Sequence, residues 1–264
     1  MNILFIGDIM GRSGRDAVFE LLWDIKNEYN IDYTIANGEN ASGGLGMNQN
    51  SYSELCRAGV DFFTMGNHTF SKKDIIGMLE SGENIVRPAN MPEGTPGEGM
   101  AIVNTSYGKK IAIINLLGRI YIDENNDSPF FTADKLIEKA KEKTNIIIVD
   151  IHAEATSEKE ALGYYLDGRV SAVVGTHTHI QTADERILPK GSAYITDAGR
   201  TGTLHSVLGL DKDASIARFI LPPDVKKPPF EVAKGKYQLC GVVIKVNDES
   251  GIAEGIERIC VLQK

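Results

Sequence analysis

The sequence predicts an α/β fold formed by a single domain, residues 1–264, with two stacked sheets and helices on their outer faces. In the first two thirds of the chain, short apolar runs alternate with segments whose apolar residues recur at helical spacing, as in β-α-β units. The last third contains strand-like runs with few helices between them, which indicates a second, more antiparallel sheet. The stretches 90–99 and 222–229 are too short for interdomain linkers, so we expect surface loops there.

The first β-α unit sets the pattern for this part of the chain. Asn2 to Ile6 is an apolar run closed by glycine, and helical spacing then follows a possible cap at Ser13. The further strands expected here are 31–36, 60–64, 101–103, 111–115, 146–151 and 170–174. The further helices are expected near 51–58, from Ser71, after a cap at Thr132, and after a capping box of Ser157 and Glu160.

The strands expected in the last third are 192–196, 217–221, 238–246 and 253–262. The polar run 247–251 is a hairpin turn signal. Cys240 and Cys260 lie symmetrically about this turn, and if they face each other we expect a reduced cross-strand pair. The three cysteines lack CxxC or CxxxC spacing, so neither a disulfide framework nor a structural zinc site is indicated, and a reducing cytoplasm is the expected location.

The composition excludes several classes of protein. Hydrophobic residues make up 42% and charged residues 24%, which is ordinary for a globular chain and excludes a disordered or collagen-like one. No signal peptide and no run of about 18 apolar residues is visible, so no membrane partner is expected. The net charge of −8 has the wrong sign for a broad nucleic-acid-binding face, so binding of an extended duplex is not expected.

Polar residues follow five of the expected strands. Because the carboxyl ends of parallel strands line one edge of an α/β sheet, we expect these residues to converge there. Carboxylates, amides and imidazoles are ligands of first-row transition metals. The converging residues are Asp8, Glu39, Asn40, Asn67, His68, His152, His177 and His179.

Taken singly, these residues have plainer explanations. A Gly-Asp pair after a strand is commonly a turn and helix cap, and a lone His152 is commonly a hydrogen-bonded, half-buried histidine. The run Thr-His-Thr-His at 176–179 is harder to explain in this way, because alternate positions of an extended backbone point the rings of His177 and His179 in the same direction. We interpret this pair as metal ligands. His205 has no comparable context and is not assigned to the site.

The motifs at the strand ends resemble those of the calcineurin-like metallophosphoesterases, and more closely those of the bacterial YmdB-type branch. The motifs are Gly7-Asp8-Ile9-Met10-Gly11, Asn37-Gly38-Glu39-Asn40, Gly66-Asn67-His68, Asp150-Ile151-His152-Ala153-Glu154 and Gly175-Thr176-His177-Thr178-His179. The resemblance extends through 196–199 and 238–259. It implies a four-layer α/β/β/α sandwich, a dinuclear metal centre and phosphodiester hydrolysis.

The sequence departs from the broad superfamily pattern at three positions. Met10 stands where most members have a histidine ligand, Glu39 where most have a bridging aspartate, and Thr69 where most have an acidic residue. The YmdB-type branch shares the glutamate and the missing histidine, so the resemblance marks them as features of that branch.

The resemblance assigns seven ligands to two ions. One ion is assigned Asp8, Asn40 and His179. The other ion is assigned Asn67, His152 and His177. Glu39 would bridge the two, and His68 would face the substrate phosphate and act as a general acid.

The resemblance therefore implies a phosphodiesterase in which a metal-bridging hydroxide attacks a small phosphodiester. The implied substrates are 2′,3′-cyclic nucleotides, with 3′,5′-cyclic forms as a second option, and the implied ions are iron, or alternatively manganese or zinc. One alternative is a phosphomonoesterase or protein phosphatase, for which Arg12 and Arg200 could supply positive charge. Another is a non-catalytic nucleotide sensor. A homo-oligomer is also implied, and the glycine-rich stretch 42–48 would either shape the mouth of the site or be merely a flexible loop.

Overall fold

The computed structural model describes residues 1–122 and 125–264, and within them the strands form two mixed sheets. The first sheet has the spatial order β2 (Asp8–Ile9), β12 (Arg200–Thr203), β13 (Tyr237–Val246), β1 (Asn2–Ile6), β3 (Tyr33–Asn37), β4 (Phe62–Thr64) and β5 (Ile85–Val86), with β14 (Ala253–Leu262) beside β13. The second sheet has the order β10 (Arg186–Ile187), β11 (Ala193–Ile195), β9 (Ala172–Thr176), β8 (Ile147–His152), β7 (Lys110–Leu117) and β6 (Met100–Asn104).

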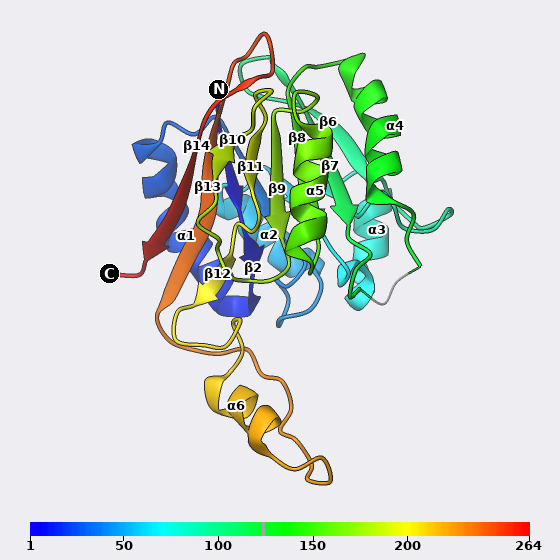
Figure 1. Cartoon of the computed structure of the whole chain (residues 1–264). Helices are drawn as coiled ribbons and strands as arrows, with labels where there is room; N and C mark the ends of the chain where they lie inside the picture. The colour runs from blue at the N-terminus through cyan, green and yellow to red at the C-terminus, as the bar shows by residue number, and fades with distance from the viewer. Residues whose placement is uncertain (123–124) are drawn as a thin grey trace.

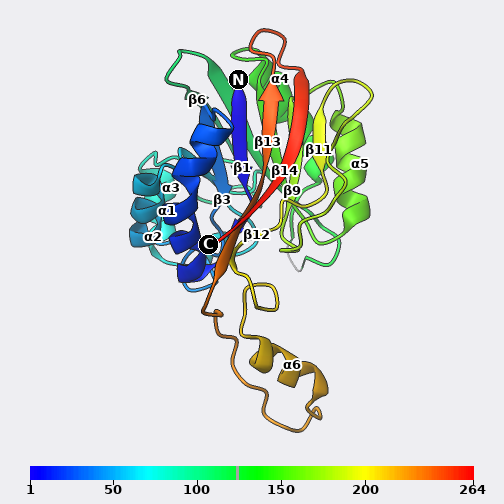
Figure 2. The ribbon, with the colours of Figure 1, turned by 90° about the vertical axis from the view of Figure 1, so that its left-hand side faces the viewer.

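Helices cover the outer face of each sheet. The first sheet carries α1 (Gly11–Glu28), α2 (Gln49–Ala58) and α3 (Asp74–Glu80), with the short 3-10 helix η1 (Thr69–Ser71) leading into α3. The second sheet carries α4 (Pro129–Lys141) and α5 (Thr156–Leu166). Figure 2 shows the stacked sheets between α1, α2 and α3 on one side and α5 on the other. The predicted four-layer α/β/β/α architecture is confirmed.

The alternation of side chains along the strands explains these layers. In β1, Ile3 and Phe5 belong to the apolar core between the sheets, whereas Leu4 and Ile6 belong to the core beneath the helices. Successive residues of a strand point to opposite faces, so each central strand contributes to two cores and must be apolar throughout.

The expectation that the last third forms the second sheet holds only for the predicted strand 192–196, which is β11 of that sheet. Strands β12, β13 and β14 join the first sheet, where β13 pairs antiparallel with β1 from Asn2↔Lys245 to Ile6↔Gly241. Most of the second sheet is formed by the middle of the chain. This pairing joins the two ends of the sequence, and a local pattern of apolar residues carries no information about such a partner.

The strand predicted at 217–221 is also wrong, because these residues belong largely to helix α6 (Lys212–Ile220). The side chain of Asp211 accepts a hydrogen bond from the Ala214 amide at 2.8 Å and caps this helix. Helix α6 lies on an excursion, residues 204–236, that leaves β12, extends away from the sheets and returns to β13 (Figures 1 and 2). Only Ser215 of the helix is buried, so no core pattern marks it in the sequence.

Three predicted helix caps are displaced. Helix α1 begins at Gly11, α4 follows Ser128, and α5 follows Ala155, so Ser13, Thr132 and the Ser157–Glu160 pair lie inside the helices. The other elements lie near their predicted ranges, and 90–99 and 222–229 form no helix or strand.

The closing hairpin places Cys240 opposite Cys260, with the two free thiol sulfurs 3.4 Å apart. No helix in the described ranges is long and apolar enough to cross a membrane.

Candidate metal centre

The carboxyl ends of parallel strands from both sheets meet along one edge of the molecule, as the sequence predicts. The side chain of Asn37, at the end of β3, donates to a carboxylate oxygen of Asp150 on β8 at 3.2 Å and thereby links the two sheets. Around this link the structure gathers the predicted residues. They are Asp8 on β2, Glu39 and Asn40 after β3, Asn67 and His68 after β4, His152 at the end of β8, and His177 and His179 after β9.

The first group of side chains surrounds Nε2 of His152, which is completely buried. Oε1 of Glu39 and Oδ1 of Asn67 each lie 3.1 Å from this nitrogen, and Nδ1 of His177 lies 3.0 Å from it. Nε2 can carry only one proton, so it cannot donate hydrogen bonds to all three of these neighbours at once. A cation placed among the four atoms could contact all of them.

The hydroxyl of Thr176 can orient the ring of His152 for metal binding through Nε2. The hydroxyl of Thr176 donates to Asp150 at 2.7 Å, so its oxygen is free to accept from Nδ1 of His152 at 2.9 Å. With its proton on Nδ1, the neutral ring presents a lone pair at Nε2 toward Glu39 and Asn67. Hydrogen bonds of this kind commonly orient metal-binding histidines.

The second group lies around Nε2 of His179, which is 3.2 Å from Oδ1 of Asn40 and 3.8 Å from Oδ1 of Asp8. The Asn40 amide donates to the carbonyl of Gly44 at 2.9 Å, which turns its oxygen toward His179. Oδ1 of Asp8 is buried and has no hydrogen-bond partner among the described residues. An unpartnered buried carboxylate oxygen costs free energy, and a bound cation would remove that cost.

Glu39 belongs to the first group and lines the same pocket as Asn40 and His179 of the second. Its Oε1 contacts His152, and its Oε2 accepts a hydrogen bond from the backbone amide of His68 at 3.0 Å. Gly66 lies against the same carboxylate and the ring of His152 and leaves no room for a side chain at position 66.

The charges of the site show that it attracts positive charge. Burial lowers the pKa of His152, but the surrounding carboxylates, Glu39 foremost, outweigh burial and raise it to about 9. Burial raises the pKa of Glu39, but its contacts with His152 and His68 outweigh this and lower it to about 2. Burial and the neighbouring His152 lower the pKa of His177 to about 3. The carboxylates therefore favour positive charge at this position.

The Thr-His-Thr-His run differs from its prediction. Strand β9 ends at Thr176, and the backbone of His177 (φ 98°) and His179 (φ 65°) is left-handed rather than extended. The two rings therefore enter different groups instead of pointing in the same direction. Such conformations are costly for residues other than glycine and cluster at functional sites.

A buried ion pair supports the segment 176–179. Nζ of Lys159 lies 2.8 Å from Oδ2 of Asp197, and both side chains are fully buried. The same carboxylate oxygen accepts from the amide and the hydroxyl of Thr178, at 3.0 and 2.7 Å. Sequence reasoning missed Lys159 as a supporting residue, because nothing in its neighbourhood distinguishes it from an exposed helical lysine.

The two groups open into a pocket of about 480 Å³. Its polar side includes Glu39, Asn40, His68, His177 and His179. Its apolar side includes Met10, Leu45 from the glycine-rich loop and four residues of the excursion, which are Leu208, Leu210, Phe230 and Val232. The loop therefore does shape the mouth. No lysine or arginine lines this pocket in the part of the chain that the structure describes.

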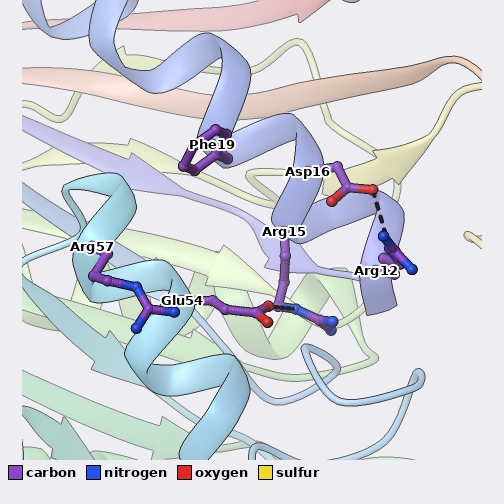
Figure 3. Close-up of a pocket in the computed structure, with 6 residues that line it drawn as sticks. All are labelled: Arg12, Arg15, Asp16, Phe19, Glu54 and Arg57. Atoms are coloured by element: carbon purple, nitrogen blue, oxygen red, sulfur yellow. Dashed lines mark hydrogen bonds and ion pairs between the residues drawn. The ribbon is translucent and has the colours of Figure 1, made fainter.

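The two arginines considered for phosphate binding lie elsewhere. Arg12 lines a separate hollow of about 400 Å³ between α1 and α2, where Figure 3 shows it paired with Asp16. Arg200 is buried and donates to the carbonyl oxygen of His179 at 3.3 Å, so it supports the loop that carries His179. His205 is exposed and does not line the pocket.

The chain is similar to one known family and to several known proteins along almost its whole length. The model of the YmdB-like protein family matches residues 4–259. A 2′,3′-cyclic-nucleotide 2′-phosphodiesterase of Bacillus subtilis is 52% identical over 99% of this chain and 97% of its own length. A putative phosphatase/phosphodiesterase of Mycoplasma genitalium is 37% identical over 99% of this chain and 93% of its own.

Two crystal structures have the same fold. A hypothetical protein from Thermus thermophilus matches with a TM-score of 0.91 and 42% identity over the whole of both chains. A phosphatase from Mycoplasma pneumoniae matches with a TM-score of 0.91 and 37% identity over 99% of this chain and 93% of its own. Both the residues at the strand ends and the similarity along the whole length lead to one assignment. The chain belongs to the YmdB-like protein family.

Proposed function

We propose that this chain is a phosphodiesterase that hydrolyses 2′,3′-cyclic nucleotides with two bound transition-metal ions, iron or alternatively manganese or zinc. The observation that carries the proposal is the division of the candidate ligand atoms into two groups, one around Nε2 of His152 that includes Glu39 and one around Nε2 of His179, with the buried Asp8 oxygen left unpartnered among the described residues. The name of the Bacillus subtilis relative supports the substrate class.

In this proposal one ion is held by Asp8, Asn40 and His179. The other is held by Asn67, His152 and His177. The Glu39 carboxylate would contribute to holding both ions. The donor set of imidazole, amide and carboxylate, without thiolate, suits iron, manganese and zinc. When bound, two such ions supply Lewis-acid stabilisation of the charge that develops at phosphorus during an in-line displacement.

The residues of the chain supply orientation and a proton. The backbone amide of His68 donates a hydrogen bond to Glu39. The imidazole of His68 lines the pocket and can donate a proton to the leaving ribose oxygen. Such a donor matters because an alkoxide is a poor leaving group. Arg200 and Asp197 hold the loop that carries His177 and His179.

The lining of the pocket favours a diester over a monoester. A phosphomonoester carries about two negative charges near neutral pH and is commonly bound by arginine or lysine, and neither residue lines the described pocket. The apolar side instead suits a nucleoside. We further propose that residues 1–264 act as one domain in the cytoplasm, in line with the apolar core shared by both sheets and the free cysteines.

The test compares three substrates after reconstitution with iron, manganese or zinc: 2′,3′-cyclic AMP, bis-p-nitrophenyl phosphate and p-nitrophenyl phosphate. Hydrolysis of the two diesters with little hydrolysis of the monoester is the expected result. Comparable hydrolysis of the monoester would favour a phosphomonoesterase. Nucleotide binding without turnover under any metal condition would favour a sensor.

A further inference from the structure

We propose that the base of the excursion forms a nucleobase subsite in which Phe230 provides the stacking surface. This inference rests on the proposed function and names the residue that would recognise the nucleoside part of the substrate. The pocket has a polar side, which holds the candidate ligand atoms, and an apolar side, which comes largely from the excursion. A cyclic nucleotide has the same division between its phosphate and its base.

The base of the excursion is a short antiparallel ribbon. Leu210 pairs with Val232, and the amide of Asp211 donates to the carbonyl of Glu231 at 2.8 Å. Alternate residues of an extended segment share a face. Consistent with this, Phe230 and Val232 line the pocket, whereas Glu231 between them is exposed.

This ribbon is packed directly against the site. A Cβ at Gly11 would lie 2.7 Å from Val232, and a Cβ at Gly44 would lie 3.0 Å from it, so the valine rests on both glycines. The carbonyl of Leu208 lies 2.9 Å from Nδ1 of His179. The ligand groups and the apolar side are therefore held in a defined relation to each other.

Phe230 is 63% exposed and lines the pocket, so much of this aromatic residue is not covered by other parts of the protein. The guanidinium of Arg218, on α6, lies 3.9 Å from the ring centroid and donates to the carbonyl of Pro228 at 2.7 Å. One face of the ring is thus supported by a cation–π contact. The remaining exposed surface is available to a flat, aromatic ligand, and a nucleobase is such a ligand.

The test is Phe230→Ala with two five-membered cyclic diesters, 2′,3′-cyclic AMP and glycerol 1,2-cyclic phosphate, which lacks a base. Loss of base stacking should raise KM for the nucleotide roughly five- to hundredfold, with little change in kcat. Turnover of the glycerol diester should not change. Phe230→Tyr should retain the wild-type KM, because its ring can stack in the same way.

Phe219→Ala is the matched control, since Phe219 is 86% exposed on the same excursion and does not line the pocket. It should behave as wild type with both substrates. Equal losses of Phe230→Ala on both diesters, or an unchanged KM for the nucleotide, would overturn the proposal.

If the wild-type enzyme hydrolyses neither diester, the proposed function fails. Binding measurements then test the nucleobase subsite independently of catalysis. In that case Phe230→Ala should weaken binding of adenosine 3′-phosphate and leave binding of glycerol 1-phosphate unchanged. Equal affinities of wild type and variant for adenosine 3′-phosphate would reject the subsite.

Discussion

Gly66→Ala changes none of the proposed ligand atoms, yet it should disable the site. Position 66 is not in the left-handed region, so the backbone accepts alanine. The added Cβ would, however, lie well under 3.0 Å from both Oε2 of Glu39 and Nε2 of His152, whereas ordinary contacts begin at 3.4 Å. The two side chains must therefore move by about 1 Å, and overpacking of this kind costs about 1–3 kcal/mol of stability.

The functional effect should exceed the effect on stability. A displacement of about 1 Å in a catalytic site can lower the rate by roughly 10²-fold. We expect kcat/KM for bis-p-nitrophenyl phosphate to fall by about that factor, together with a loss of bound metal measured by elemental analysis. Urea unfolding should show a protein that is still folded.

Gly77→Ala is the matched control, because it lies inside α3 and its added Cβ would meet nothing within 4 Å. It should stabilise the protein by about 0.5–1 kcal/mol through helix propensity and leave activity unchanged. The reasoning is refuted if Gly66→Ala keeps its metal content and its activity within about twofold of wild type.

Four further outcomes are expected. Glu39→Gln should lose more activity than Asn40→Ala. Glu39→Gln removes the anion proposed to lie between two cations, whereas water can replace the neutral amide of Asn40. Retention of both metals and most turnover by Glu39→Gln would contradict the bridging role. His68→Ala should keep its metals and lose roughly 10²–10⁴-fold on a cyclic nucleotide, but less on bis-p-nitrophenyl phosphate, whose leaving group needs no proton; equal losses would assign His68 to phosphate binding instead. Elemental analysis of metal-replete protein should find close to two transition-metal equivalents per chain, and one or none would exclude the dinuclear proposal. Lys159→Met should lower the free energy of unfolding by roughly 3–5 kcal/mol, because it leaves the carboxylate of Asp197 buried without its cation. An unchanged midpoint of urea unfolding would show that the ion pair does not stabilise the fold.

The sequence alone was enough to predict most of the strands and helices and the residues that converge at the candidate site. Strands such as β1 and β8 are recognisable because their apolar runs have the right length and end in glycine or polar residues. The rule that parallel strands end along one edge was sufficient to predict that Asp8, Glu39 and His152 lie close together. These inferences depend only on neighbours in the chain or on a general property of α/β sheets.

Tertiary structure decided everything that depends on contacts between distant segments. The partner of β1 is β13 at the opposite end of the chain, and the excursion with α6 buries too little apolar surface to leave a pattern. The separation of His177 from His179 follows from left-handed backbone that local propensity does not predict. The need for glycine at position 66 arises because a strand end from one sheet touches a histidine from the other. Periodicity reports which face of an element is buried, but only the packed molecule determines what lies against that face.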